Sequence, residues 1–224
     1  MTHTQWEPRD QVPKPILDLL KPEHGDAKNY NYITAFYQIV SLLKQQKRTG
    51  WIDKKVPDPE SIADHMYRMS IIAMSLNRDS LEKDGKKPDL SQCVKIALVH
   101  DIAESLVGDI VPHDVDVGKE EKHDREYRTI QFLSETIKPY NEEFSKEITN
   151  LWLDYEYQRT LEGTIVKDID KYELLIQTFE YERLHNVRLD EFFSCRSVIK
   201  HIEIQNLADK LLQEREEWIE REDA

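Results

Sequence analysis

The sequence predicts an all-α fold, a single bundle of about six to eight helices. Three observations predict this class. Glycine accounts for only 6 of the 224 residues, where roughly 7% is usual, so turn-dense β-sandwiches are disfavoured. Charged residues make up 33% of the chain, which is typical of helices with a solvated face. Apolar residues recur at helical spacing along most of the chain, and we find no internal repeat.

The N-terminal segment differs in composition from the rest. Residues 1–27 contain prolines at positions 8, 13, 15 and 22, and because proline interrupts regular helices we expect an irregular, proline-rich arm here. Residues 28–224 are expected to form one domain that ends in a C-terminal helical extension.

The first long helix is predicted from Asn31 to near Gly50, because apolar residues recur there every three or four positions. A loop over residues 51–59 should follow. Asp58 and Pro59 form a favourable N-cap and first-turn pair for the next helix, whose apolar stripe includes Met66 and Met69. After a turn over residues 84–89, Asp89 is expected to cap another helix.

That next helix, SQCVKIALVHDIAESL, is apolar nearly all round in its middle and is therefore expected to be central. A long loop over 108–118 follows. Further helices are predicted at about 119–138, 140–158, 161–185 and from about Arg196 onward.

Charge and composition exclude several functions. The 44 acidic and 31 basic residues give a net charge of −13, which repels phosphate backbones, so no long nucleic acid is expected as a partner. Neither a GxGxxG nor a GxxxxGK[ST] phosphate loop is present. No apolar run approaches the roughly 20 residues that span a bilayer, and no membrane association is expected. Two cysteines without CxxC spacing, and no signal-peptide core, indicate a cytoplasmic or nuclear location.

Ionisable residues interrupt two apolar helix faces. His65 lies in the stripe of Met66 and Met69, and His100-Asp101 interrupts a run of aliphatic residues. A buried carboxylate needs a cation or a donor network, since an unpaired one is very costly. A single histidine in such a position is more often a hydrogen-bonded core residue than a ligand. The combination of these three with Glu104, Asp109 and an acidic late helix favours a metal site.

Imidazoles with carboxylates form a mixed nitrogen and oxygen ligand set that suits divalent Mn, Co, Fe, Ni or Zn. A metal so held acidifies bound water and polarises a phosphoryl oxygen. Glu104 follows His100 by one helical turn and could orient the water or protonate a leaving group; the alternative is a solvent-exposed acid at a helix end. In the late helix, the residues alone do not distinguish Asp168 from Asp170.

Several longer strings carry a resemblance. They are ESIADHMYRM, ALVHDIAESLVGDIVP, KEEKH and VKDIDKYELLIQ, within a region from about Ala35 to Leu189. Together they resemble the HD-domain metal-dependent phosphohydrolases, and within these the 5′-deoxynucleotidase subfamily. The resemblance implies an HD-domain helical bundle for residues 28–224.

The resemblance also implies roles. His65, His100, Asp101 and Asp170 would hold the divalent metal, with Mn, Co, Mg or Zn as candidates. Glu104 and Asp109 match the catalytic acids, and in some members these two and the carbonyl of Ile110 hold a second ion. Arg48 and Trp51 match the substrate-side pair that precedes the first histidine, although two residues separate them here and none in bacterial members. Trp51 could equally be a core aromatic.

The function so implied is hydrolysis of 2′-deoxyribonucleoside 5′-monophosphates to deoxynucleoside and phosphate, with metal-bound water as nucleophile and a small deoxynucleotide as substrate. A homodimer is implied as well. Three alternatives are open: another HD phosphohydrolase acting on a dNTP, a cyclic nucleotide or a guanosine polyphosphate; a non-catalytic helical interaction module; and a purely structural metal.

Overall fold

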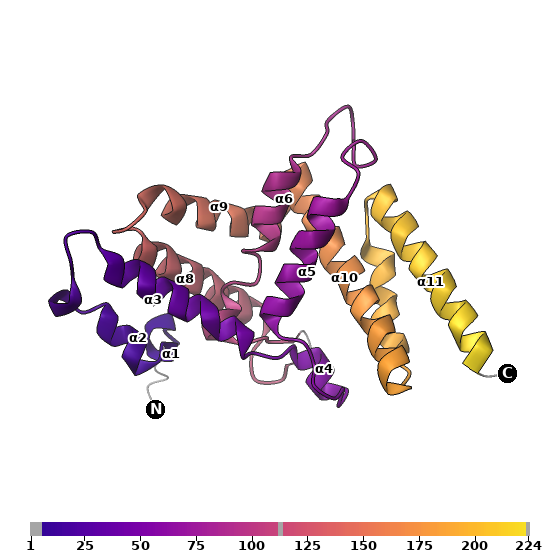
Figure 1. Ribbon diagram of the computed structural model, residues 1–224, viewed down its shortest axis with the longest axis horizontal. Coiled ribbons are helices and arrows are strands. Elements are labelled where there is room, and N and C mark those ends of the chain that lie inside the picture. The colour runs from indigo at the N-terminus through magenta and orange to yellow at the C-terminus, as the bar shows by residue number, and fades with distance from the viewer. Residues whose placement is uncertain (1–5, 112–113, 223–224) are drawn as a thin grey trace. The chain divides into compact units, whose positions relative to one another are not determined.

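The computed structural model describes residues 6–111 and 114–222. These residues contain helices and connecting segments, with only two isolated β-bridges. Figure 1 shows the helices in chain order. The predicted all-α class is confirmed, and seven α-helices of eight or more residues occur in this described part of the chain. Within the same ranges, no helix combines the length and apolar character that crossing a membrane requires.

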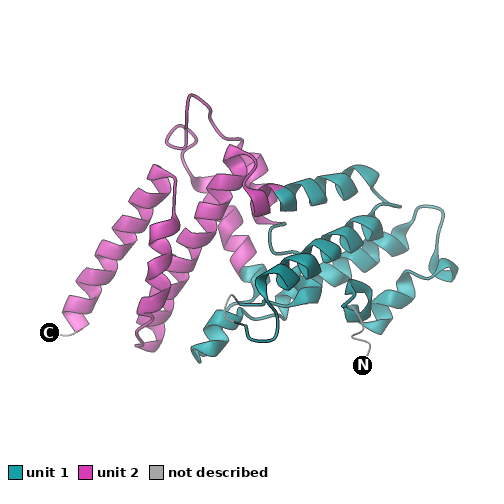
Figure 2. Cartoon of the chain, turned by 180° about the vertical axis from the view of Figure 1, so that it is seen from behind, with its two compact units in different colours: residues 1–64, 99–153 teal, residues 65–98, 154–224 magenta. Residues whose placement is uncertain are grey.

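The chain divides into two compact units, each made of two separate stretches of sequence (Figure 2). Unit 1 comprises residues 1–64 and 99–153, and unit 2 comprises residues 65–98 and 154–224. Two helices carry a unit boundary, α5 (Ile62–Ser75) between residues 64 and 65, and α9 (Glu142–Tyr157) between residues 153 and 154.

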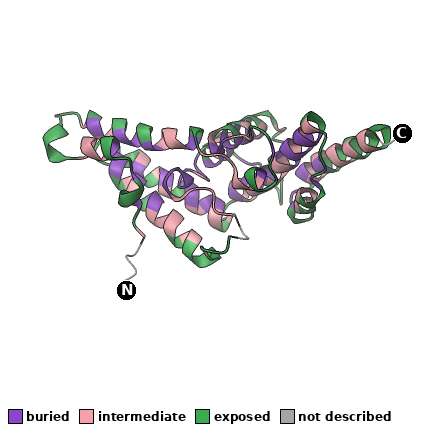
Figure 3. Ribbon diagram, turned by 90° about the horizontal axis from the view of Figure 1, so that it is seen from below, coloured by how far each residue is buried: buried purple, intermediate pink, exposed green. Residues whose placement is uncertain are grey.

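Unit 1 begins with short helices and ends with long ones. Its other elements are α1 (Pro8–Gln11), α2 (Lys14–Leu19), η1 (Pro22–His24), α3 (Tyr30–Val40), η2 (Ser41–Lys44), α4 (Thr49–Asp53), α7 (Glu104–Val107) and α8 (Lys119–Ile137). Their apolar faces supply a core that includes Phe36, Ile39, Leu133, Ile148 and Trp152. Figure 3 shows the resulting alternation of buried and exposed residues along the helices.

The segment predicted to be an irregular arm contains α1 and α2. Each of these helices has a proline at its first or second position, where the missing N–H costs nothing because no partner exists within the helix. Proline therefore begins these helices and does not interrupt them. The boundary at residue 27 stays a prediction.

Unit 2 is built around the longest helix, α10 (Leu161–His185). The other elements are the main part of α5, α6 (Leu90–Ala97), η3 (Asp190–Val198) and α11 (Ile202–Glu222). α10 packs against α6, η3 and α11, and its core positions include Ile165, Ile169 and Leu175. The predicted cap of α6 agrees with the structure, since Asp89 accepts from the N–H groups of Ser91 and Gln92. The limits predicted for the helix over 161–185 also agree.

Three predicted boundaries are wrong. The helix expected from Asn31 to Gly50 ends at Val40 and gives way to a 3₁₀ turn, and α4 covers part of the expected loop. Asp58 does not cap α5. The backbone of the preceding loop is left-handed at Lys55, with φ 57°, and at Asp58 itself, with φ 44°. Ser61 caps the helix instead, because its hydroxyl accepts from the Asp64 N–H and the Asp64 carboxylate accepts from the Ser61 N–H at 2.8 Å.

The third difference bears on the site. The helix predicted through SQCVKIALVHDIAESL ends at Ala97, and residues 98–103 form turns. Their backbone bonds join residues three apart, as in Ile102 N–H to Val99 O and Glu104 N–H to Asp101 O. His100 and Asp101 therefore lie on tight turns between α6 and α7, and the α-helical spacing assumed for Glu104 does not apply.

Candidate metal and phosphate site

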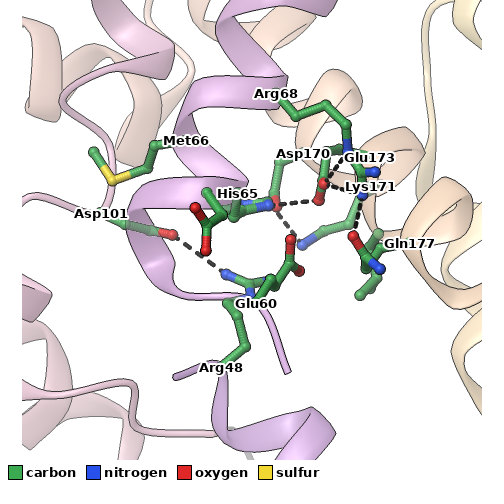
Figure 4. Close-up of polar contacts among 12 residues, drawn as sticks. Arg48, Glu60, His65, Met66, Arg68, Asp101, Asp170, Lys171, Glu173 and Gln177 are labelled. Atoms are coloured by element: carbon green, nitrogen blue, oxygen red, sulfur yellow. Dashed lines mark hydrogen bonds and ion pairs between the residues drawn. The ribbon is translucent and has the colours of Figure 1, made fainter. Parts of the chain in front are cut away.

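In unit 2, helices α5 and α10 bring an imidazole and a carboxylate together. Nε2 of His65 lies 3.4 Å from Oδ1 of Asp170, and His65 is fully buried. On its other side, Nδ1 of His65 lies 2.5 Å from Oε2 of Glu173. Asp170 and Glu173 are three residues apart on α10 and so share a face of that helix. Figure 4 shows both carboxylates beside His65.

Glu173 belongs to a wider polar cluster. Arg68 donates from Nε to Oε1 of Glu173 at 2.8 Å and from Nη2 to Oε1 of Gln177 at 2.5 Å, and it also pairs with Glu180. Burial lowers the pKa of Arg68, but the charges of Glu173 and Glu180 raise it more, so its pKa is raised. This guanidinium places a positive charge beside the buried Glu173, and a carboxylate so paired accepts the Nδ1 proton of a neighbouring imidazole such as His65.

The lone pair of His65 Nε2 is thereby directed toward Asp170, which is the arrangement a histidine ligand requires. The sequence reasoning missed Glu173, Arg68 and Gln177. The only available signal was their helical spacing, Arg68 three residues after His65 and Gln177 four after Glu173, and solvent-exposed residues show the same spacing.

The structure distinguishes the two aspartates that the sequence left open. Asp168 accepts the backbone N–H groups of Lys200 at 3.0 Å and His201 at 2.6 Å, just before α11. Burial raises the pKa of Asp168, and these two hydrogen bonds oppose that rise. Asp170 instead accepts from the Tyr155 hydroxyl at 2.8 Å and from Lys171 Nζ at 2.8 Å, and it lies beside His65.

In unit 1, His100 and Asp101 form a second imidazole and carboxylate pair. Nε2 of His100 lies 3.0 Å from Oδ2 of Asp101, and the histidine is buried while the aspartate is half-buried. Nη1 of Arg48, from the residue just before α4, donates to the same Asp101 oxygen at 3.4 Å (Figure 4). The phosphate contact predicted for Arg48 stays a prediction.

Glu104 is buried, so the alternative of a solvent-exposed helix-end acid is wrong. Burial raises its pKa well above the usual range, and the nearby charges of Asp101 and Asp109 raise it further. Lys122 of α8 lies 3.7 Å from Oε1 of Glu104 and opposes this rise. A carboxyl group in this environment favours the protonated form and can act as an acid.

Asp109 and Ile110 are held by neighbours in the same unit. Asp109 accepts the Thr49 N–H on Oδ2 at 2.6 Å, and its backbone carbonyl accepts the Thr49 hydroxyl at 2.6 Å. This carboxylate therefore caps the first turn of α4. The carbonyl of Ile110 accepts from Nζ of Lys122 at 2.7 Å. The roles predicted for Asp109 and Ile110 stay predictions.

Trp51 is 1% exposed, and its Nε1 donates to Glu60 at 3.0 Å. This burial agrees with the alternative of a core aromatic on α4. Its predicted contact with substrate stays a prediction.

The donor set fits a divalent metal. A transition-metal ion holds nitrogen and oxygen ligands at about 2.0–2.2 Å, so two ligands at a right angle lie about 3.0 Å apart. The Nε2···Oδ separations of 3.4 Å for His65 with Asp170 and 3.0 Å for His100 with Asp101 are of this size. The four predicted ligands divide evenly between the two units.

Comparison with known proteins agrees with this chemistry. The family model described as the HD domain matches residues 40–211, more than half of the chain. The chain belongs to the HD-domain family. This family comprises metal-dependent phosphohydrolases.

Named relatives are similar over most of their length. The chain is 45% identical to the 5′-deoxynucleotidase YGK1 of Saccharomyces cerevisiae over 218 residues, 96% of this chain and 95% of the relative. It is 41% identical to the human 5′-deoxynucleotidase HDDC2, covering 80% of this chain and 84% of the relative. Among solved structures, the HD domain-containing protein YGK1 matches with a TM-score of 0.71 at 39% identity, covering 96% of this chain and 99% of the other. The PH0347 protein of Pyrococcus horikoshii matches with a TM-score of 0.61 at 31% identity, covering 80% of this chain and 96% of the other.

Proposed function

We propose that this chain is a metal-dependent 5′-deoxynucleotidase that hydrolyses 2′-deoxyribonucleoside 5′-monophosphates to deoxynucleoside and inorganic phosphate. The observation that carries the proposal is 45% identity, over 96% of the chain, to a relative named for this activity. The local geometry supports it, because both predicted imidazole and carboxylate pairs have metal-ligand spacing.

The metal would be held by His65, His100, Asp101 and Asp170. A bound divalent ion supplies Lewis acidity, which lowers the pKa of water and offsets phosphoryl charge. Mn, Co, Mg and Zn are the candidate ions, since nitrogen and oxygen ligands suit several of them. In this proposal Glu173 and Arg68 hold His65 in the tautomer that presents Nε2.

The remaining residues act on the substrate. The guanidinium of Arg48 would bind phosphate oxygens, as its position beside Asp101 allows. The carboxyl of Glu104, whose pKa is raised by burial, would give its proton to the departing 5′ oxygen. Water adds to phosphorus, the P–O5′ bond breaks, and the proton that water loses restores the Glu104 carboxyl, so that the products are the deoxynucleoside and phosphate.

The test is a panel of deoxy- and ribonucleoside 5′-monophosphates assayed for phosphate release, after chelator stripping and addition of single metals. We expect metal-dependent release from the deoxy substrates and much slower release from the ribo substrates. Equal rates on both series would contradict the substrate assignment. Pyrophosphate or triphosphate release, or hydrolysis of a cyclic nucleotide, would indicate another HD phosphohydrolase activity.

A matched pair of variants tests the mechanism. Glu104→Ala should abolish turnover while metal content is retained, because it removes the proton donor. Glu121→Ala, an exposed acid on α8, should keep full turnover. Near-normal turnover in Glu104→Ala would refute the assigned role.

We also propose a homodimer in the cytoplasm, and in the nucleus as well, on the basis of the family resemblance. Light scattering after size-exclusion chromatography tests the proposed dimer, and a measured mass of one chain would refute it. Fractionation of cells tests the proposed location. With a net charge of −13, we expect no binding to long nucleic acids.

A further inference from the structure

The inference concerns Tyr155, whose hydroxyl holds one oxygen of Asp170. Oδ1 of Asp170 lies 3.4 Å from Nε2 of His65. Oδ2 instead accepts from the Tyr155 hydroxyl at 2.8 Å and from Nζ of Lys171 at 2.8 Å. Tyr155 and Asp170 are both buried, and all four residues belong to unit 2. The two oxygens of this carboxylate therefore lie in different surroundings.

The turn between α9 and α10 fixes the place of Tyr155 relative to Asp170. Asp154, the preceding residue, accepts the backbone N–H of Thr160 on Oδ1 at 2.9 Å and the Thr160 hydroxyl on Oδ2 at 2.7 Å. The same hydroxyl accepts the N–H of Gly163, in the first turn of α10, at 3.1 Å. Side-chain hydrogen bonds thus tie the end of α9 to the start of the helix that carries Asp170.

The aromatic ring of Tyr155 is held as well. Nζ of Lys167, on α10, lies 3.9 Å from the centroid of this ring, which is the geometry of a cation–π contact. A tyrosine side chain has only two torsions that move its heavy atoms, so burial of the ring leaves the hydroxyl oxygen little freedom. Lys171 reaches Asp170 on a flexible four-carbon stem, and its side chain is 32% exposed. Tyr155 is therefore the rigid donor to this carboxylate.

We propose that Tyr155 is a positioning residue for Asp170: its hydroxyl binds Oδ2 and leaves Oδ1, on the side of His65, for the metal ion. The inference rests on the proposed metal site and is independent of the substrate. Glu173 is the corresponding partner of His65. Partners that orient a metal ligand in this way typically contribute about 10–100-fold to metal affinity.

The experiment compares the wild type with Tyr155→Phe and with Tyr157→Phe, a matched control at an exposed tyrosine of the same helix. Phenylalanine keeps the ring and removes only the hydroxyl. Competition with a fluorescent chelator measures Mn²⁺ binding to the metal-stripped proteins. We expect the dissociation constant to rise about 10–100-fold in Tyr155→Phe and to stay within about twofold of the wild type in Tyr157→Phe.

A second measurement distinguishes positioning from general stability. The visible absorption of bound Co²⁺ depends on the number and geometry of its ligands. At saturating Co²⁺ we expect an altered spectrum in Tyr155→Phe, because the rigid donor no longer holds Oδ2. A weaker affinity with the wild-type spectrum would indicate a structural role and overturn the inference, and so would an unchanged affinity.

The inference and the proposed metal site can fail separately. A wild type that binds no Mn²⁺ would overturn both, whereas equal binding by wild type and Tyr155→Phe would overturn only the role of Tyr155. If circular dichroism shows that Tyr155→Phe does not fold, Thr160→Val decides, because it removes the hydroxyl that ties α9 to α10. Weaker Mn²⁺ binding with an altered Co²⁺ spectrum in Thr160→Val would support the inference, and wild-type binding would overturn it.

Discussion

Nδ1 of His65 lies 2.5 Å from Glu173, and a histidine held in this way keeps its proton on Nδ1 and offers Nε2 to a metal. Replacement by glutamine keeps the volume of Glu173 and removes its charge. We expect Glu173→Gln to weaken metal binding by about 10–100-fold, measured by competition with a fluorescent chelator.

Glu180→Gln is the matched control, because Glu180 pairs with the same Arg68 and is not hydrogen-bonded to His65. Its metal affinity should stay within about twofold of the wild type. Equal losses in the two variants would indicate that Arg68 acts through general stability, and Glu173 would then have no positioning role.

The two aspartates of α10 give a second prediction at this scale. Asp170→Asn should remove the metal and leave the fold intact. Asp168→Asn should keep the metal and lower the free energy of unfolding by about 1–3 kcal/mol, because the carboxylate bonds to two backbone N–H groups before α11. Elemental analysis and urea denaturation measure the two effects. Exchanged outcomes would refute the assignment of Asp170.

At the scale of the element, the start of α5 determines how His65 is presented. The reciprocal bonds between Ser61 and Asp64 cap this helix. We expect Ser61→Ala to lower the free energy of unfolding by about 0.5–2 kcal/mol, measured by urea denaturation. Ser75→Ala, at the exposed end of the same helix, should change it by less than about 0.5 kcal/mol. A similar loss in both would contradict the cap.

The first turn of α10 is packed closely against α9. A Cβ on Gly163 would lie 2.4 Å from Oδ1 and 2.6 Å from the backbone oxygen of Asp154. Gly163→Ala should therefore destabilise the protein by about 1–3 kcal/mol, measured by thermal unfolding. Gly118→Ala is the control, since nothing lies within 4 Å of its Cβ position. Wild-type stability of Gly163→Ala would refute this packing.

At the scale of the whole molecule, an ion that binds only the folded chain stabilises it. With free metal at about 100 times its Kd, the free energy of unfolding should rise by about 2.7 kcal/mol. Addition of a chelator should reverse the rise in melting temperature. The melting temperature of His65→Ala should not change with metal. A wild type whose melting temperature also does not change with metal would contradict the proposed ion.

Periodicity predicted the long helices well, and α10 has the predicted limits of 161–185. It failed at 41–48 and 98–103, where apolar spacing continues but the backbone changes to 3₁₀ bonds and turns. Apolar spacing reports burial and not the hydrogen-bond pattern, so such breaks are invisible to it. The left-handed backbone at Asp58 is likewise set by the surrounding loop.

The residues of the candidate site also differ in how far the sequence predicts them. His65, His100 and Asp101 stand out because they interrupt apolar faces. Glu173 and Lys122 do not, because charged residues at helical spacing also occur on solvated faces. Their partners identify them, and for Glu173 that partner lies 108 residues away. Pairings over such distances are not encoded in local pattern.

The division of each unit into two stretches of sequence has a consequence for the nascent chain. His65 is synthesised 108 residues before Glu173, an interval of roughly 5–20 s at usual elongation rates of about 5–20 residues per second. Until residue 154 is synthesised, unit 2 consists at most of residues 65–98, without its longest helix. If the proposed metal site is correct, native metal loading must therefore follow translation of α10, whatever the metal supply at the ribosome.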